Sequence, residues 1–125
     1  MQERYEVVMS GKAKDDLKYI ITYINATLNE PTIAKKYVKI IRERIKSLEY
    51  FPQKYVIIDD EKLMDLKIRK LIIKNYIAFY RINENKKIVT IERIIYGKND
   101  WINKLWLAKD WIVINLVFLF SKNFI

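Results

Sequence analysis

Two residue types that are central to enzyme chemistry are missing from this chain of 125 residues, which contains no cysteine and no histidine. Without cysteine it can form neither a disulfide nor a thiolate nucleophile. Without histidine it lacks the commonest general base at neutral pH and the commonest zinc ligand. Any catalysis would have to use Lys, Arg, Tyr, Asp or Glu, and we expect neither a metal ion nor another cofactor.

Glycine and proline occur only twice each, and long apolar runs are scarce as well. The longest apolar stretch, residues 112–120, is interrupted by Asn115 and falls well short of the roughly 20 residues of a membrane-spanning helix. The N-terminal residues lack the apolar core of a signal peptide. We therefore expect a cytoplasmic protein that does not enter a membrane, in agreement with its lack of disulfides.

Positive charge dominates the composition. The chain carries 24 Lys and Arg against 15 Asp and Glu, a formal net charge of +9, and 51% of its residues are hydrophobic. Its length and apolar content suit one packed domain rather than two. The charge predicts attraction to nucleic acid, to an acidic protein or to an anionic membrane surface, although it could also serve solubility alone.

The N-terminal half of the sequence predicts one strand followed by two helices. Residues 5–9 have the composition of a short strand, and the hydroxyl of Ser10 can cap a helix that starts after it. Two sets of apolar residues then recur at helical spacing, separated by Pro31, and the second set ends before Pro52. The first set is Ala13, Leu17, Ile20, Ile21, Ile24 and Leu28, and the second is Ala34, Tyr37, Val38, Ile41, Ile45 and Leu48. Because the break is short, the helices should form an antiparallel hairpin.

The second half predicts three strands, near residues 65–73, 76–82 and 87–96. Short polar turns connect them, which implies antiparallel neighbours. The expected fold is therefore α+β: an N-terminal strand and an antiparallel helical hairpin packed on a small, mainly antiparallel β-sheet. The hairpin should cover one face of the sheet and leave the other free to bind a partner. Several strand positions are apolar on both faces, so an alternative is that the C-terminal tail or a partner covers the second face.

Basic residues recur along these strands. Arg69, Arg81 and Arg93 fall on three adjacent predicted strands. If their side chains share one face, they form a compact cationic cluster suited to phosphate or carboxylate. Lys98 follows the last strand, and Tyr96 beside it could stack on a base or transfer a proton. These five residues are our catalytic candidates, and the four cations are also candidates for contact with a target or with nucleic acid. The alternative is that the arginines are solvent-facing residues without such a role.

A series of short motifs in a fixed order spans residues 5–105. None is specific by itself, but together they resemble the RelE/ParE superfamily of bacterial type II toxins, whose order is a strand, two helices and a three-stranded antiparallel meander. The motifs are Tyr5-Glu6-Val7-Val8-Met9-Ser10, Asp16-Leu17, Tyr23-Ile24, Ile68-Arg69, Asn75-Tyr76, Phe79-Tyr80-Arg81-Ile82, Ile91-Glu92-Arg93-Ile94 and Tyr96-Gly97-Lys98-Asn99-Asp100. The resemblance implies a toxin domain at residues 1–105 that arrests growth. It also implies a cognate acidic antitoxin, encoded beside the toxin, whose charge would complement the basic chain.

The superfamily, as this resemblance implies, divides into two activities. RelE-like members cut mRNA in the ribosomal A site, using several Lys and Arg on the sheet and a C-terminal Tyr, whereas ParE-like members poison DNA gyrase. Where the RelE-like pattern has Arg, Arg and Tyr, this chain has Ile77, Asn99 and Leu105, and only Lys98 survives. The resemblance therefore favours a ParE-like or otherwise non-nucleolytic toxin. The alternatives are a RelE-like ribosome-dependent mRNA endoribonuclease, a decayed toxin, and a non-toxic nucleic-acid-binding module.

Residues 106–125 extend beyond the resemblance and are unusually apolar for a terminus. Large exposed apolar patches need cover, so this extension could pack on its own domain or form a homodimer or antitoxin interface. It could also be an incidental addition to the gene end. We therefore treat it as a C-terminal apolar extension that is separate from the toxin domain.

Overall fold

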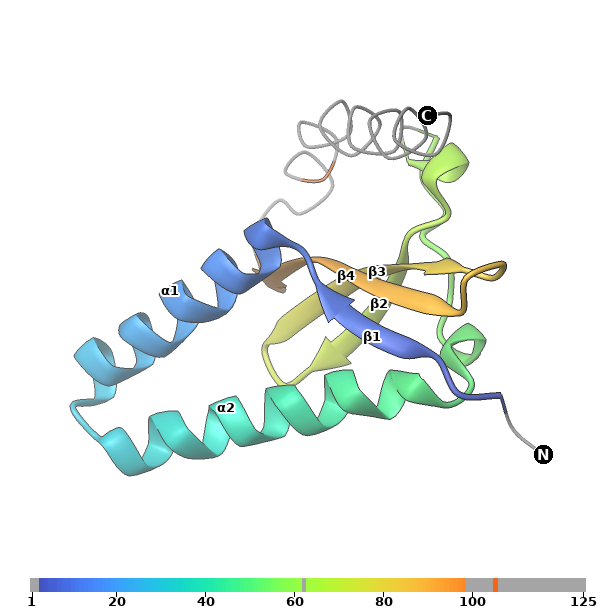
Figure 1. The fold of residues 1–125 in the computed structure, drawn as a ribbon. Coiled ribbons are helices and arrows are strands. Elements are labelled where there is room, and N and C mark those ends of the chain that lie inside the picture. Colours follow the sequence, from blue (N-terminus) through green and yellow to red (C-terminus); the bar gives the residue numbers. More distant parts are fainter. Residues whose placement is uncertain (1–2, 62, 99–104, 106–125) are drawn as a thin grey trace, which may run out of the picture.

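The computed structural model describes residues 3–61, 63–98 and 105, which adopt an α+β fold (Figure 1). The regular elements are β1 (Glu6–Met9), α1 (Gly11–Leu28), α2 (Pro31–Lys46), β2 (Arg69–Ile73), β3 (Tyr76–Asn83) and β4 (Ile88–Tyr96). The predicted order of one strand, two helices and a three-stranded meander is confirmed. Within the described ranges, no helix is both long and apolar enough to cross a membrane.

The four strands form one sheet in the order β1-β4-β3-β2. The pairs β2–β3 and β3–β4 are antiparallel, whereas β1 runs parallel to β4. A parallel pair needs a long crossover between its strands, and the helical hairpin is part of that connection. The prediction of a mainly antiparallel sheet is therefore confirmed, with the N-terminal strand as the parallel exception.

Local sequence signals explain where α1 and α2 begin. The hydroxyl of Ser10 accepts a hydrogen bond from the backbone amide of Ala13 and caps α1, as expected. The helix ends at Asn29, whose left-handed backbone (φ 50°) is a conformation that asparagine tolerates better than most residues. Pro31 then occupies the first turn of α2. A backbone N–H at that position would have no intrahelical partner, so proline costs no hydrogen bond there.

Two predicted boundaries are wrong. Helix α2 ends at Lys46 rather than just before Pro52, because the chain continues through two short 3₁₀ turns, Ser47–Glu49 and Pro52–Lys54. Strand β2 begins at Arg69 rather than near residue 65, because residues 64–66 form a third 3₁₀ turn. Lys67 then adopts a positive φ of 51°, which a continuous strand does not allow.

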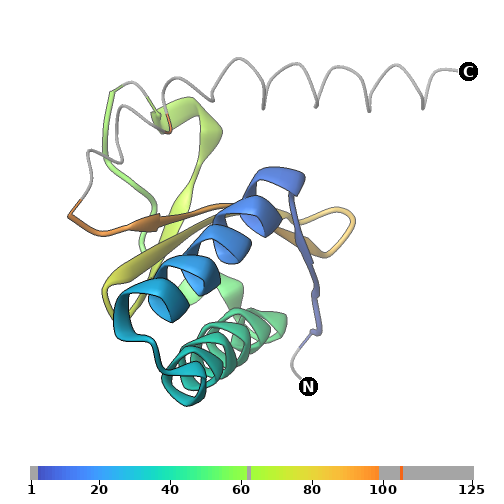
Figure 2. The same cartoon turned by 90° about the vertical axis from the view of Figure 1, so that its left-hand side faces the viewer.

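Both helices lie on the same side of the sheet and diverge from their connecting loop (Figures 1 and 2). Their apolar stripes pack against the inward-facing residues of the strands to form the main core. The helical members of that core are Ala13, Leu17, Ile20, Ile24, Ala34, Ile41 and Ile45, and the strand members include Leu71, Ile73, Tyr76, Ala78, Tyr80, Val89, Ile91 and Ile94. The predicted covered face is thus confirmed.

The expectation that the opposite face of the sheet is free is wrong. A second cluster of buried apolar side chains covers it, which we call the far-face cluster. Its members are Ile58, Leu63, Leu66, Ile68, Ile77, Phe79, Ile95 and Leu105. The connection between α2 and β2 supplies the first four, and these pack on the strands. Every residue of β3 from Tyr76 to Tyr80 is buried, so this strand needs cover on both faces.

Several sequence-based expectations fall outside the described residues. These concern Asn99 and the apolar extension 106–125, including its suggested role in a homodimer. They stay predictions.

Candidate functional site: a tyrosine pocket and a cationic groove beside helix α1

The first two candidate arginines lie on opposite faces of the sheet. Arg69 pairs with Tyr80 across β2 and β3 and therefore faces the helices, whereas Arg81, the next residue on β3, faces the far side. The Nη1 of Arg69 donates to the carbonyl oxygens of Gln53 (2.9 Å) and Tyr55 (2.6 Å). The Nε of Arg81 donates to the carbonyl oxygen of Leu66 (3.0 Å). Both guanidinium groups hold loops in place.

The third arginine is engaged elsewhere. Arg93 forms a two-point ion pair with Asp16 of α1, with Nε–Oδ2 and Nη2–Oδ1 distances of 2.8 and 3.1 Å. Arg69, Arg81 and Arg93 therefore do not share the one face that a common cationic cluster would require. The roles of the individual residues stay predictions. Of the candidate residues, the structure brings together only Arg93, Tyr96 and Lys98, at the C-terminal end of β4.

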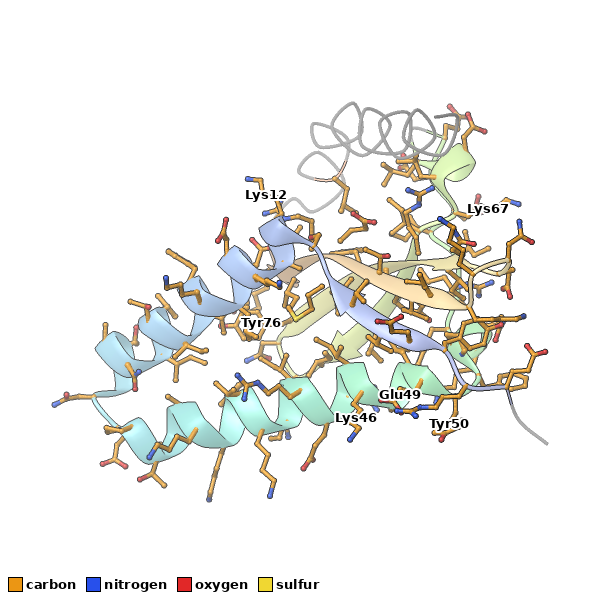
Figure 3. The ribbon with its side chains drawn as sticks, in the orientation of Figure 1. Lys12, Lys46, Glu49, Tyr50, Lys67 and Tyr76 are labelled. Atoms are coloured by element: carbon orange, nitrogen blue, oxygen red, sulfur yellow. The ribbon has the colours of Figure 1, made fainter. Side chains whose placement is uncertain are left out.

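This end of β4 borders a cavity of about 510 Å³ between α1, α2 and the sheet, which we call the tyrosine pocket. Five of the nine tyrosines of the chain line it: Tyr19, Tyr23, Tyr37, Tyr76 and Tyr96. In Figure 3 the labelled Tyr76, between the helices and the sheet, shows where the tyrosine pocket lies. The rings of Tyr76 and Tyr96 are in contact, with centroids 5.7 Å apart and planes tilted by 60°. The floor is apolar, formed by isoleucines of α1 and β4.

The charges in the tyrosine pocket compensate each other. Among the described residues that line it, Asp16 and Arg93 are the only acidic and basic ones, and they pair with each other. Burial raises the pKa of Tyr76 above its usual 10.0, and the nearby hydroxyls of Tyr37, Tyr23, Tyr96 and Tyr19 raise it further. The Tyr76 phenol therefore stays neutral at physiological pH and can donate or accept a hydrogen bond.

A second, smaller hollow adjoins the tyrosine pocket and contains Lys98. Both share Asn75, Tyr76 and Tyr96 as a common rim. Lys74, in the β2–β3 turn, and Lys98, after β4, line the second hollow. The rim is fixed because the amide of Gly97 donates to the carbonyl oxygen of Asn75 (2.8 Å). A Cβ at Gly97 would approach that oxygen to 3.2 Å, so a larger residue would crowd this contact.

On the other side of α1 lies a groove of about 440 Å³ between β1, α1 and α2, which we call the cationic groove. Its floor is apolar and consists of Val7, Met9, Leu17, Ile21 and Ile45. Its rim carries Lys14, Lys18, Arg42 and Lys46. The one acid among the described lining residues is Glu49, which pairs with Arg4. Lys46 and Glu49 mark the end of the groove near the C-terminus of α2 (Figure 3). In the described part of the chain none of the four rim cations forms an ion pair.

The edge of β1 adds backbone groups to this groove. The amides of Glu6 and Ser10 donate toward β4, so the alternate residues Val7 and Met9 direct their backbone groups away from the sheet. Since β1 is the last strand of the sheet, this edge is available for pairing.

Sequence reasoning missed most of the residues in these two sites. Tyr19 and Tyr23 follow Asp16 at helical spacing, and Lys14 and Lys18 are four residues apart on another side of α1. The sequence shows this helical spacing, but it does not reveal which other elements pack beside each side of α1. For the described residues, no group of three or more acidic, His or Cys side chains is arranged to hold a metal ion.

The far-face cluster contains two of the positions at which the chain departs from the RelE-like pattern. Ile77 and Leu105 are 8% and 0% exposed and belong to this one apolar cluster.

Comparisons with known proteins agree with this architecture. A family model described as the ParE toxin of the type II toxin–antitoxin system parDE matches residues 7–101, well over half of the chain. The chain belongs to the ParE toxin family. This assignment confirms the superfamily resemblance and makes the protein a toxin of a type II toxin–antitoxin system. No protein of curated function matches its sequence.

Solved structures share the fold of this ParE-family toxin at low sequence identity. The chromosomal ParDE system of Pseudomonas aeruginosa matches with a TM-score of 0.62 and 21% identity, covering 77% of this chain and 99% of the other. The RelBE2 toxin–antitoxin complex of Mycobacterium tuberculosis matches at 0.53 and 18%, covering 77% and 94%. The archaeal RelE–RelB complex of Pyrococcus horikoshii matches at 0.53 and 15%, covering 77% and 98%.

Proposed function

We propose that this ParE-family toxin arrests growth by inhibiting DNA gyrase and does not cut RNA. The observation that carries the proposal is the burial of Ile77 and Leu105 in one apolar cluster. A nuclease without histidine needs cations to stabilise the charged phosphorane and a group to accept the proton of the attacking hydroxyl. Neither isoleucine nor leucine can supply these functions at the two positions where the RelE-like pattern has Arg and Tyr.

The separation of the candidate arginines supports the same conclusion. A RelE-like reaction through Arg69, Arg81, Arg93 and Lys98 would need several of these cations around one phosphate. Arg69 and Arg81 instead bind loop carbonyl oxygens on opposite faces, and Arg93 is neutralised by Asp16. The alternative of ribosome-dependent mRNA cleavage therefore lacks an assembled site among these residues.

Two assays on the purified toxin test this proposal. We expect it to inhibit DNA supercoiling by gyrase and to leave ribosome-bound mRNA intact. In cells, induction should stop growth without new mRNA ends inside codons. New mRNA ends inside codons, with unaffected supercoiling, would establish the nuclease alternative instead. If expression arrests nothing and gyrase is not inhibited, the chain is a decayed toxin or a binding module.

We further propose that a cognate acidic antitoxin binds the cationic groove. Four cations that form no ion pair with any described residue surround an apolar floor there. This arrangement is the complement of an amphipathic segment with acidic residues on its polar side. The outward edge of β1 could pair with such a segment if it is extended. The similar structures from Pseudomonas, Mycobacterium and Pyrococcus are structures of toxin–antitoxin systems or complexes. This supports a partner of the same kind here.

Charge reversal on each wall of the groove tests the antitoxin proposal. Lys18→Glu and Arg42→Glu should together slow association with the protein encoded beside the toxin gene at least about tenfold, because opposite charges steer encounter. The matched control is Lys35→Glu with Lys36→Glu, two exposed lysines of α2 that do not line the groove. Equal effects of the two double variants would show that only net charge matters. Unchanged association in both would reject the groove as the docking site.

A further inference from the structure

We propose that the tyrosine pocket is a binding site for single-stranded nucleic acid, with bases stacked on its exposed rings and phosphates held by Lys74 and Lys98. This inference goes beyond gyrase inhibition and does not depend on it. The site borders the far-face cluster, because Ile95 lines the tyrosine pocket and Ile77 lines the adjoining hollow with Lys74 and Lys98.

The rings that form the proposed stacking surface are exposed. Tyr19, Tyr23 and Tyr96 are 72%, 54% and 36% exposed, although all three line a cavity with an apolar floor. Every base has a π-face, so aromatic side chains in a groove bind single strands with little dependence on sequence. The cavity volume of about 510 Å³ is in the range of sites that enclose a group the size of a nucleoside rather than a duplex.

Cations lie directly beside the rings. Lys74 and Lys98 are exposed and line the hollow that shares Asn75, Tyr76 and Tyr96 with the tyrosine pocket. Over the described ranges neither lysine takes part in an ion pair. A strand that crosses the rim shared by the two hollows would therefore pass from the ring faces of one hollow to the lysines of the other.

Negative charge in the pocket is already neutralised. The Asp16 carboxylate accepts both guanidinium hydrogen bonds of Arg93 and the backbone amide of Ile94 (2.9 Å). It therefore opposes an approaching phosphate less than a free carboxylate would. An acidic protein segment is served better by the cationic groove, which is lined by four cations against two here, none of them ion-paired within the described part of the chain. The tyrosine pocket instead offers ring faces beside two lysines, which is the combination that suits a single strand.

The test measures anisotropy of fluorescent thymidine and uridine oligonucleotides of about ten residues with the full-length toxin at low salt. Both Tyr23→Ala and Tyr96→Ala should weaken binding about 5- to 150-fold, the range for loss of one stacked base. Tyr96→Phe should retain binding, because phenylalanine keeps the ring. Lys74→Gln with Lys98→Gln should reduce the slope of log affinity against log salt by about 1.4, the value for two phosphate contacts on a single strand.

Matched controls separate the pocket from general attraction to a basic protein. Tyr50 is a similarly exposed tyrosine (46%) remote from the pocket, and Tyr50→Ala should leave affinity unchanged. Lys46→Gln removes one positive charge from the cationic groove and should also have little effect on oligonucleotide affinity. Binding of either or both oligonucleotides that falls in Tyr23→Ala and Tyr96→Ala but not in Tyr50→Ala supports the site.

Two results would overturn the proposal. The first is no binding of either oligonucleotide by the folded wild-type toxin at low salt. The second is binding that is lost in Lys46→Gln but unaffected by Tyr23→Ala and Tyr96→Ala, which would assign the nucleic acid to the cationic groove. The anisotropy measurements contain no gyrase, so neither result bears on whether the toxin inhibits that enzyme.

Discussion

Asp16 of α1 and Arg93 of β4 form a two-point ion pair that joins the first helix to the last strand. Strand β1 ends at Met9, and beyond it the Asp16 carboxylate accepts the amide of Ile94. One carboxylate thereby pairs with a guanidinium group and also satisfies a strand amide that has no β1 partner. The pair thus secures the wall of the tyrosine pocket that lies between α1 and β4.

Removing the Asp16 carboxylate should destabilise the toxin more than neutralising it. Asp16→Ala leaves the Arg93 guanidinium and the Ile94 amide without their acceptor, and we expect a loss of about 2–3 kcal/mol in the free energy of unfolding. Asp16→Asn retains one carbonyl oxygen and should lose less. Urea denaturation of both variants measures this difference. Equal stability of Asp16→Ala and the wild type would mean that the ion pair contributes nothing to folding.

Ser10 should contribute more to stability than an ordinary helix cap. Its hydroxyl accepts from the amide of Ala13 (3.0 Å) and donates to the carbonyl oxygen of Glu92 (2.8 Å), so it links α1 to β4. We expect Ser10→Ala to cost about 1–2 kcal/mol in thermal or urea unfolding. Thr22→Ala is the control, since the Thr22 hydroxyl bonds only to its own helix and is exposed. A cost no greater than that of the control would contradict the cross-link.

The two neighbouring isoleucines Ile72 and Ile77 should respond differently to the same substitution. They are register partners on β2 and β3, but Ile72 is 58% exposed whereas Ile77 is 8% exposed within the far-face cluster. Ile77→Ala should cost about 2–4 kcal/mol through lost burial and a cavity. Ile72→Ala should change stability by only about 0.5 kcal/mol. Similar costs in equilibrium unfolding would show that the far-face cluster is not a packed core.

Glu92 should make stability depend on pH. It occupies the bulge in β4 at the register shift opposite Phe79 and Tyr80, and burial raises the pKa of its carboxyl above the ordinary value of 4.5, with Arg81 partly opposing the shift. The folded state therefore favours the protonated form. The stability that the protonated Glu92 carboxyl contributes is fully present below the ordinary pKa. It is lost as the pH rises through the raised pKa of the folded state.

Thermal melts at acidic and neutral pH test this sign. Glu92→Gln should be more stable than the wild type near neutral pH, and the difference should disappear below the ordinary carboxyl range. Glu43→Gln is a control for charge alone, because Glu43 is exposed and its contact with Lys39 is at the surface. A Glu92→Gln variant that is less stable at neutral pH would mean that the ionised carboxylate is favoured instead.

Most of the architecture could be predicted because it depends on local signals and periodicity. Helical spacing of apolar residues identified both helices, and the Ser10 cap and the Pro31 start marked their beginnings. The short turn at Lys74 and Asn75 implied the β2–β3 hairpin. The end of α2 was misplaced because the 3₁₀ turn Ser47–Glu49 continues helical geometry, and no proline or glycine marks the end of the helix at Lys46.

The candidate site was predictable only in part, because strand pairing decides which side chains meet. Arg69 and Arg81 were correctly placed on adjacent strands, yet the pairing of Arg69 with Tyr80 puts them on opposite faces. A register shift of one residue would have placed the two arginines on the same face. The order of residues in the two strands does not by itself show which register forms. The partner of Arg93 is 77 residues away along the chain.

The sequence by itself determined the class of fold, the basic character and the absence of histidine and cysteine chemistry, because these depend on residue types and short-range spacing. It also revealed Ile77 and Leu105 as departures from the nuclease pattern. Only the tertiary structure decided that these two residues share an apolar cluster and that the two sides of α1 border grooves of different chemistry. The physical reason is that a helix exposes each of its sides to a different neighbour, and long-range packing chooses those neighbours.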